Sequence, residues 1–283
     1  MVLYLQSISN VAEVLKMKIT FVGVGNMAGA IIRSIINSGR LKPQDITLFD
    51  HNETKYEPFL KLGALAAKDL TEACEASNMI LLAVKPQDYQ SLLEDIKSRG
   101  CCDSSKIFIS VAAAISTSYI CSTLGIECPV VRVMPNTPLL LGVGATAISR
   151  NKYVTDKDYT KICGLFAASG TVTALDESLM NAVISVNSTS PVYLYMLAKA
   201  MIDNSVEQGI DEKASRELVF QALKGSVEML CKSEYSPDEL IKMVASPKGT
   251  TEAALKKLNE LNFCDVVSKA MYACTQRADE IGR

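Results

Sequence analysis

The sequence predicts an α/β protein, in which a doubly wound parallel sheet is followed by an all-α part. Three observations support this. Short apolar runs alternate with amphipathic stretches in the first half, a glycine-rich turn follows the first apolar run, and beyond about Asp176 only long helical patterns occur. Alternation of strands and helices is typical of a parallel sheet flanked by helices. A chain of 283 residues is also long enough for two domains.

Five apolar runs are predicted to form the buried strands of this sheet. They are rich in Ile, Val, Leu and Phe and lack strict two-residue alternation, as expected for strands covered by helices on both faces. Two later runs are expected to be edge strands, with a helix over 156–168 between them. In chain order, the predicted strands are 18–22, 46–50, 79–84, 106–112, 130–134, 142–149 and 171–175.

The rest of the chain is predicted to be helical. Long helices are expected over 191–208, 212–232 and 263–281, with shorter ones after Ser236 and Thr250. Several are apolar on more than one face, and such helices must be buried against something. We therefore predict a first domain over residues 1–176 and a helical domain over 177–283 that forms a subunit interface.

Composition excludes several classes of function. The chain has 29 basic and 31 acidic residues, a net charge of −2, which provides no basic surface for nucleic acid or an anionic membrane. Its single histidine, His51, rules out a multi-histidine metal site, and we predict no metal. A Ser-His-Asp triad would depend on that one ring. An enzyme with this sequence is expected to work without histidine.

Cysteine usage and the first residues bear on compartment. Nine cysteines, with no CxxC pair, are expected to be small hydrophobic residues in a reducing cytosol. Residues 1–16 lack a basic start and contain Gln6, Asn10 and Glu13, so we interpret them as an extension and not as a signal peptide. The apolar runs are too short for a membrane span. The sequence thus predicts a soluble, cytoplasmic protein.

The glycine-rich turn carries the strongest local signal. Gly23, Gly25 and Ala28 form a GxGxxA pattern that includes Asn26 and Met27 and lies between a predicted strand and a helix. Gly23 permits the tight turn, Gly25 lets a pyrophosphate approach the backbone, and Ala28 keeps helix and strand close. In this context the pattern predicts a Rossmann-type, dinucleotide-binding domain.

Asp50 lies 22 residues beyond Ala28, at the end of the next predicted strand. A carboxylate there accepts hydrogen bonds from the ribose 2′-hydroxyl and repels a 2′-phosphate, which favours NADH over NADPH. Asn52 and Lys55 follow closely and could soften that repulsion, as could His51, which we otherwise expect to be a solvated loop residue.

Four segments together resemble the pyrroline-5-carboxylate reductase family, which catalyses the last step of proline synthesis. The resemblance extends from Met17 almost to the end of the chain. It rests on the glycine-rich turn at 22–29, Ala-Val-Lys-Pro at 83–86, Met-Pro-Asn-Thr-Pro at 134–138, and Ala-Ser-Pro-Lys-Gly-Thr-Thr at 245–251. It implies an N-terminal Rossmann domain, a C-terminal helical dimerisation domain, a homodimer that can assemble further into a decamer, and NADH or NADPH as cofactor.

The resemblance also implies roles for individual residues. Besides the glycine-rich turn and Asp50, the cofactor would contact Ala83, Val84, Lys85, Pro86, Asn136 and Thr137. The substrate carboxylate would be held by Ser246, Gly249, Thr250 and Thr251, with Asn136 nearby. The Thr251 hydroxyl would lie near the ring nitrogen and act in catalysis. Hydroxyls and free amides at the start of a helix suit a carboxylate, although Thr250 or Thr251 could instead cap the helix.

This chain departs from the family pattern at four positions. Ser188 and Val192 are bulkier than the usual residues, Lys242 stands where an acidic residue is common, and Lys248 replaces a glycine. Added bulk can narrow a pocket, and Lys248 adds positive charge beside a carboxylate site. These departures bear on substrate identity more than on the class of reaction.

The implied reaction is hydride transfer from NAD(P)H to the C=N carbon of L-1-pyrroline-5-carboxylate, which gives L-proline. A protonated cyclic imine is already an electrophile, so the enzyme needs orientation and a dry pocket more than a strong acid. The alternatives are a paralogous imine reductase, a beta-hydroxyacid-type dehydrogenase using Lys199, or a non-catalytic NAD(P)-sensing paralogue. Lys199 lies about two turns inside its predicted helix, where it is badly placed for that chemistry.

Overall fold

The computed structural model describes residues 17–282, so the predicted extension at 1–16 lies outside the described residues. The chain divides into two compact units. The first unit consists of the chain up to Thr189 together with the C-terminal segment from Cys274. The second unit is Ser190–Ala273. This division falls beyond residue 176 because the intervening segment packs on the sheet, where Met180 and Ile184 join an apolar cluster with Met134.

The first unit is built on an eight-stranded sheet in the order β3-β2-β1-β4-β5-β6-β7-β8. All pairs of neighbouring strands are parallel except β6 and β7. The strands are β1 (Ile19–Val22), β2 (Ile46–Phe49), β3 (Leu65–Ala66), β4 (Met79–Leu82), β5 (Ile107–Ser110), β6 (Val130–Met134), β7 (Gly144–Arg150) and β8 (Gly170–Ala174).

All seven predicted strands are present, with two differences from the sequence-based expectation. The two-residue β3 was not predicted, because both its residues are exposed and the strand is too short for a periodic signal. β7 runs antiparallel to β6. The connection 135–143 is too short for the crossover of about a dozen residues that a parallel neighbour requires.

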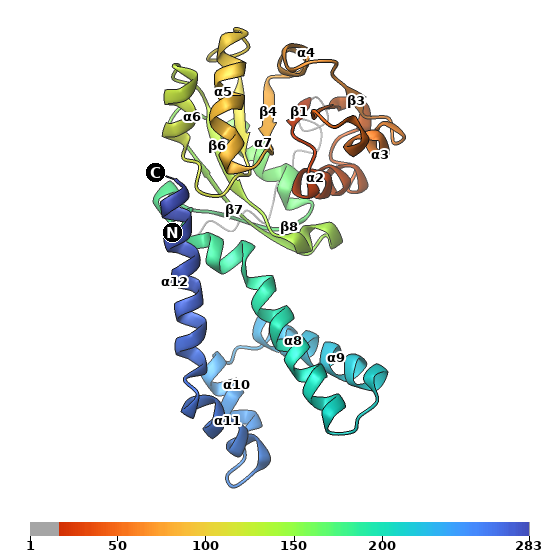
Figure 1. Cartoon of the computed structure of the whole chain (residues 1–283), viewed down its shortest axis with the longest axis vertical. Helices are drawn as coiled ribbons and strands as arrows, with labels where there is room; N and C mark the ends of the chain where they lie inside the picture. The colour runs from red at the N-terminus through yellow and green to blue at the C-terminus, as the bar shows by residue number, and fades with distance from the viewer. Residues whose placement is uncertain (1–16, 283) are drawn as a thin grey trace. The chain divides into compact units, whose positions relative to one another are not determined.

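Helices cover both faces of the sheet (Figure 1). Alternate strand residues face opposite sides: Leu81 packs with Phe21 in one apolar core, and Leu82 packs with Val22 in the other. Helices α2 (Asn26–Asn37), α3 (Glu57–Leu60) and α7 (Asp156–Ala167) contribute to the first core, and α4 (Leu70–Glu75), α5 (Tyr89–Ser98) and α6 (Thr117–Leu124) to the second. Short 3₁₀ turns span Pro43–Asp45, Glu53–Lys55, Pro86–Asp88, Thr137–Leu141 and Glu177–Leu179.

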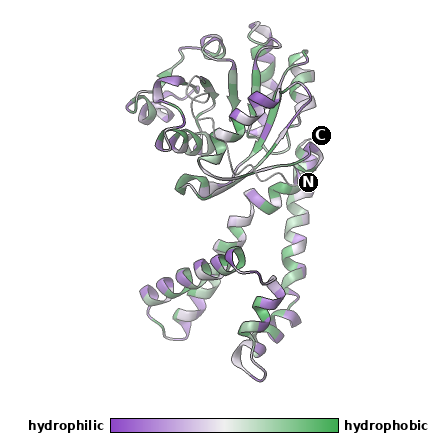
Figure 2. Cartoon of the chain, turned by 180° about the vertical axis from the view of Figure 1, so that it is seen from behind, coloured by the Kyte–Doolittle hydropathy of each residue, from purple (hydrophilic) through white to green (hydrophobic). Residues whose placement is uncertain are grey.

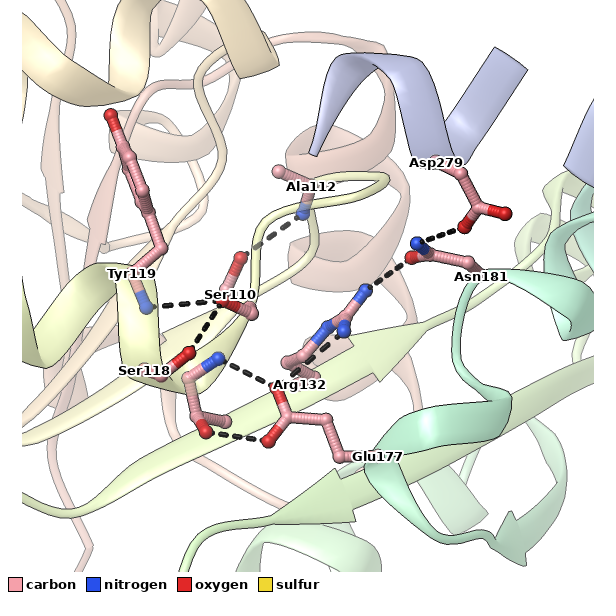
Figure 3. A network of polar contacts seen from close by, with 10 residues as sticks. Ser110, Ala112, Ser118, Tyr119, Arg132, Glu177, Asn181 and Asp279 are labelled. Atoms are coloured by element: carbon pink, nitrogen blue, oxygen red, sulfur yellow. Dashed lines mark hydrogen bonds and ion pairs between the residues drawn. The ribbon is translucent and has the colours of Figure 1, made fainter. Parts of the chain in front are cut away.

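A polar network joins β6 to segments far along the chain (Figure 3). Arg132, whose side chain is 4% exposed, pairs with Glu177 at 3.5 Å. The Glu177 carboxylate also accepts hydrogen bonds from the amide and hydroxyl of Thr117, both at 2.6 Å. Arg132 donates to Asn181 at 3.1 Å, and Asn181 donates to Asp279 at 2.8 Å. The network thereby connects the sheet with α6 and the last residues of the final helix.

The second unit is helical. It contains α8 (Ser190–Glu207), α9 (Glu212–Lys232), α10 (Pro237–Val244), α11 (Thr250–Glu260) and the first part of α12 (Phe263–Ile281), which continues into the first unit. Figure 2 shows apolar residues distributed along these helices, and many are exposed in the single chain, including Tyr195 and Met196 on α8. Among the described residues, no helix combines the length and apolarity needed to cross a membrane.

Candidate functional site

A cleft of about 720 Å³ opens at the carboxyl ends of β1, β2 and β4. The strand order reverses direction between β1 and β4, and ligands of open α/β sheets bind at such a switch point. The cleft is lined by Val22, Gly23, Gly25, Phe49, Asp50, His51, Asn52, Lys55, Leu70, Ala83, Val84, Lys85, Gln87, Asp88, Ser91, Leu92 and Asp95.

The two glycines of the turn shape this cleft in different ways. Gly23 has φ +90°, and a Cβ there would lie 2.9 Å from the carbonyl carbon and oxygen of Ala83. Gly25 is the N-cap residue of α2, and a Cβ there would meet nothing within 4 Å. It provides no side-chain cap, so the first amides of α2 have no side-chain acceptor at the N-cap. Free amides at a helix N-terminus suit the pyrophosphate of a dinucleotide.

Asp50 is the acidic group of the cleft, and its side chain is 9% exposed. It accepts hydrogen bonds from the amides of Val24 at 2.7 Å and Asn52 at 2.9 Å. The Lys55 ammonium lies 3.0 and 3.1 Å from its two oxygens. Burial raises the pKa of Asp50, but the amides of Val24 and Asn52 and the ammonium of Lys55 outweigh burial and hold the pKa below its ordinary value. The carboxylate is therefore ionised at neutral pH.

The cleft brings together a large part of the predicted cofactor site. Gly23, Gly25, Asp50 and the segment 83–85 all line it. Asn26, Met27 and Ala28 form the first turn of α2, with Ala28 buried, and Pro86 begins the 3₁₀ turn after Lys85. Residues 51–55 and 87–95 that line the cleft carry no motif, so only the fold identifies most of them. His51 lies at the cleft with its ring edge-to-face with Phe49.

Asn136 and Thr137 do not line this cleft. Asn136 is 8% exposed. Its Oδ1 accepts from the Ala145 amide at 2.9 Å, and its Nδ2 donates to the Asn187 carbonyl at 3.4 Å. The amide side chain therefore ties the β6–β7 connection to a later segment, and its predicted contact with cofactor and substrate stays a prediction.

That later segment is a π-helical turn at Ile184–Ser188, which the sequence did not reveal. Asn187 donates to the Met134 carbonyl at 2.6 Å, and Ser188 donates to the Pro135 carbonyl at 3.0 Å. π-Helical turns are rare and are frequently found at functional sites. The hydroxyl of Ser188 is thus accommodated by the backbone it faces. The neighbouring departure, Val192, is half exposed in this chain.

The predicted substrate loop lies in the second unit, before α11. Gly249 is the N-cap of this helix and forms no side-chain cap, so the alternative in which Thr250 or Thr251 caps the helix is wrong. Lys248 adopts a left-handed conformation with φ +60°, and its amide donates to the Glu252 carboxylate at 2.6 Å. Neither threonine hydroxyl serves as the cap.

The thiols and the other metal-ligating side chains are the candidates for a second site among residues 17–282. All nine cysteines are free, and burial raises the pKa of Cys74 to about 12 and that of Cys163 to about 11, so both remain protonated at neutral pH. Within the part of the chain that the structure describes, no three His, Cys, Asp or Glu side chains could together hold a metal ion.

Two family models match the chain. Residues 177–281 match one described as pyrroline-5-carboxylate reductase dimerisation, and residues 18–114 match one described as NADP oxidoreductase, coenzyme F420-dependent. Among solved structures, Plasmodium falciparum pyrroline carboxylate reductase with NADP bound has a TM-score of 0.86 and 28% identity, covering 95% of this chain and 99% of that one. The reductase of Coxiella burnetii has a TM-score of 0.84, also with 28% identity, over 94% of this chain and 99% of that one.

Curated relatives extend the likeness over nearly the full length. The pyrroline-5-carboxylate reductase of Escherichia coli strain K12 is 31% identical over 267 residues, covering 94% of this chain and 98% of the relative. That of Methanosarcina acetivorans is 33% identical over 271 residues, with the same coverage. This chain therefore belongs to the pyrroline-5-carboxylate reductase family.

Proposed function

We propose that this protein reduces L-1-pyrroline-5-carboxylate to L-proline with a nicotinamide nucleotide as hydride donor, as the final step of proline synthesis. The observation that carries the proposal is the full-length match to reductases of this name, together with the cleft at the strand switch point. It is an oxidoreductase acting on a C=N bond.

The geometry of the cleft supports a nicotinamide dinucleotide independently of the sequence relatives. The uncapped start of α2 suits the pyrophosphate, the open space over Gly25 admits it, and Asp50 can accept from a ribose hydroxyl. The bound nucleotide supplies the hydride, and the protein supplies orientation and electrostatics. Ala83, Val84 and Lys85 form the wall contributed by the segment that follows β4, which we assign to the nicotinamide side. Because Asp50 is ionised, we propose that NADH is favoured over NADPH.

The loop 245–251 is proposed to hold the substrate. Its uncapped helix start presents amides that suit the carboxylate, with Ser246, Gly249 and Thr250 as further contacts. The Thr251 hydroxyl is assigned to the ring nitrogen, where it orients the imine by a hydrogen bond. The substrate carries its own proton on nitrogen, so this arrangement needs no histidine.

We further propose a cytoplasmic homodimer, with assembly to a decamer as its larger form. The match of residues 177–281 to a dimerisation family and the exposed apolar helices of the second unit support the dimer. Lys199, which a beta-hydroxyacid dehydrogenase would require as its acid–base group, is instead ion-paired with Asp203 on the same helix.

The direct test is oxidation of NADH and of NADPH, followed by absorbance, with pyrroline-5-carboxylate as substrate. Turnover that depends on the imine is expected with at least one nucleotide. Nucleotide binding without turnover would contradict the reductase assignment and favour a sensing role. A strong preference for NADPH would contradict the proposed effect of Asp50.

Replacement of Thr251 tests the assigned contact with substrate. Thr251→Ala should lower kcat/KM by about tenfold or more, the worth of one hydrogen bond to a charged group. Thr251→Ser keeps the hydroxyl and should recover most of the loss. Steady-state kinetics with the imine make the measurement, and an unchanged kcat/KM in Thr251→Ala would remove the residue from the site.

A further inference from the structure

The carboxylate of Asp50 has no acceptor position to spare. An ionised carboxylate offers about four lone-pair sites, two on each oxygen. Oδ1 accepts from the Asn52 amide and the Lys55 ammonium, and Oδ2 accepts from the Val24 amide and the same ammonium. The two amides are held by the backbone, whereas Lys55 has a flexible side chain that is 45% exposed. A ribose hydroxyl can therefore bond to Asp50 only if the Lys55 ammonium moves away from the carboxylate.

The two nicotinamide nucleotides place different demands on this pair. A ribose with a free 2′-hydroxyl donates to the carboxylate and competes directly with the ammonium. A ribose 2′-phosphate is repelled by Asp50 but is a strong acceptor for a nearby ammonium. Lys55 can reach such a phosphate because it lines the same cleft beside Asp50.

We propose that Lys55 selects between NADH and NADPH by competing with the ribose for Asp50. This rests on the proposed binding of a nicotinamide nucleotide in the cleft. With NADH, the ion pair must open before the ribose can bond to Asp50, which reduces the preference for NADH that Asp50 alone would give. With NADPH, the displaced ammonium gains the 2′-phosphate as its partner and offsets the repulsion from Asp50. The choice of cofactor is thus set by a pair of residues and not by the acidic residue alone.

The other residues of the 50–55 segment are not placed for this role. Asn52 accepts through Oδ1 from the amide and hydroxyl of Thr54, at 3.1 and 2.7 Å, so its carboxamide oxygen is committed to the local turn. The ring of His51 lies against Phe49. Glu53 is acidic and would add to the repulsion of a phosphate. Lys55 is the one lysine within this segment.

The test measures binding of two nucleotide fragments, so it does not depend on reductase activity. Adenosine 5′-diphosphate and adenosine 2′,5′-bisphosphate are titrated calorimetrically into the full chain and into Lys55→Met. The bisphosphate should bind about tenfold more weakly to the variant, since one charge-assisted contact is lost. The diphosphate should bind about twofold tighter, since an exposed ion pair no longer competes, and unchanged binding of the diphosphate would overturn the competition for Asp50.

Two further variants separate selection from a general effect of charge. Lys55→Arg keeps the cation and should retain bisphosphate binding. Lys61→Met removes the same charge from an exposed position that does not line the cleft, and should change neither affinity. Thermal unfolding with and without each fragment checks that every variant is folded.

Equal weakening of both fragments in Lys55→Met, or no change in either, would overturn the inference while leaving the reductase proposal intact. Failure of the unaltered protein to bind either fragment would overturn both the nucleotide cleft and the inference. A protein that binds both fragments as expected but fails to reduce the imine would leave the role of Lys55 standing and reject the reductase proposal.

Discussion

Asp50 shows how much one residue depends on its surroundings. Its place in the sequence predicts a ribose-binding acid, and in the fold it is also a hydrogen-bonded anchor for the neighbouring backbone. The amides of Val24 and Asn52 connect it to the glycine-rich turn and to its own loop. The residue thus anchors the backbone around the cleft, in addition to its proposed part in the choice of cofactor.

The lowered pKa of Asp50 predicts an effect on stability in acid. A group whose pKa is depressed by folding stabilises the fold above its ordinary pKa, 3.8, and this contribution is lost as the pH falls through the lower folded value. Asp50→Asn should therefore lower the Tm at neutral pH but show a smaller further decrease below pH 3.8. Thermal unfolding over this pH range makes the measurement, and parallel Tm curves for the two proteins would contradict the prediction.

At the scale of elements, the turn between β1 and α2 packs against the sheet, and we propose that it also binds the nucleotide. Gly23 lies against the backbone of Ala83 and Val84, just after β4, whereas Gly25 faces open space. The motif assigns the tight turn to Gly23 and the approach of the pyrophosphate to Gly25, and the surroundings of each glycine fit those roles.

Matched alanine substitutions test this division. Gly23→Ala adds a Cβ against the Ala83 carbonyl in a left-handed conformation, and should destabilise the protein by about 2 kcal/mol or more. Gly25→Ala should leave the Tm nearly unchanged but weaken nucleotide binding by about tenfold or more, because the methyl group occupies the space for the pyrophosphate. Denaturant unfolding and nucleotide titration measure the two effects, and an unstable Gly25→Ala protein would contradict the assignment.

The Arg132 network predicts a second effect at this scale. Glu177→Gln leaves the buried guanidinium of Arg132 without its charged partner. The substitution should lower the free energy of unfolding by about 3 kcal/mol. Amide exchange should increase first near Asp279, where the network ends on α12. The double variant Arg132→Met with Glu177→Gln removes the uncompensated charge and should recover part of the loss. If the losses in unfolding free energy of Arg132→Met and Glu177→Gln simply add in the double variant, the two residues are not energetically coupled.

At the scale of the whole molecule, the second unit carries exposed apolar side chains on its helices. Met196 on α8 is 67% exposed in the single chain, with Tyr195 beside it at 60%. Apolar surface of this extent is typical of a protein–protein interface, and the family model for this region is a dimerisation model.

A charge placed on this surface should disrupt the dimer. Met196→Glu is expected to shift the protein towards the monomer, because a carboxylate would be buried without a partner in the interface. Light scattering after size exclusion measures the mass. Leu62→Glu, a similar change at an exposed position in the first unit, should leave the mass unaltered. A Met196→Glu protein with unchanged mass would place the interface elsewhere.

Much of the fold could be predicted because its signals are local. Apolar runs marked the strands, and the predicted ranges for β6 (Val130–Met134), α9 (Glu212–Lys232) and α12 (Phe263–Ile281) agree with the structure. The antiparallel β7 and the π-helical turn at 184–188 were missed, since they depend on how distant segments pack. Within the site, the motifs identified Gly23, Gly25 and Asp50. No sequence pattern could show that the side-chain amide of Asn136 forms hydrogen bonds with Ala145 and Asn187.

The sequence alone determined the α/β class, the nucleotide-binding turn and the family, because residue type and spacing carry these. Only the tertiary structure decided that Lys55 fills the remaining positions on Asp50, that Gly249 caps α11 in place of a threonine, and that Arg132 is tied to Glu177. These contacts depend on which donors and acceptors the fold brings within hydrogen-bonding distance of one another. A motif specifies the groups that are present, and the fold specifies which of them are already occupied.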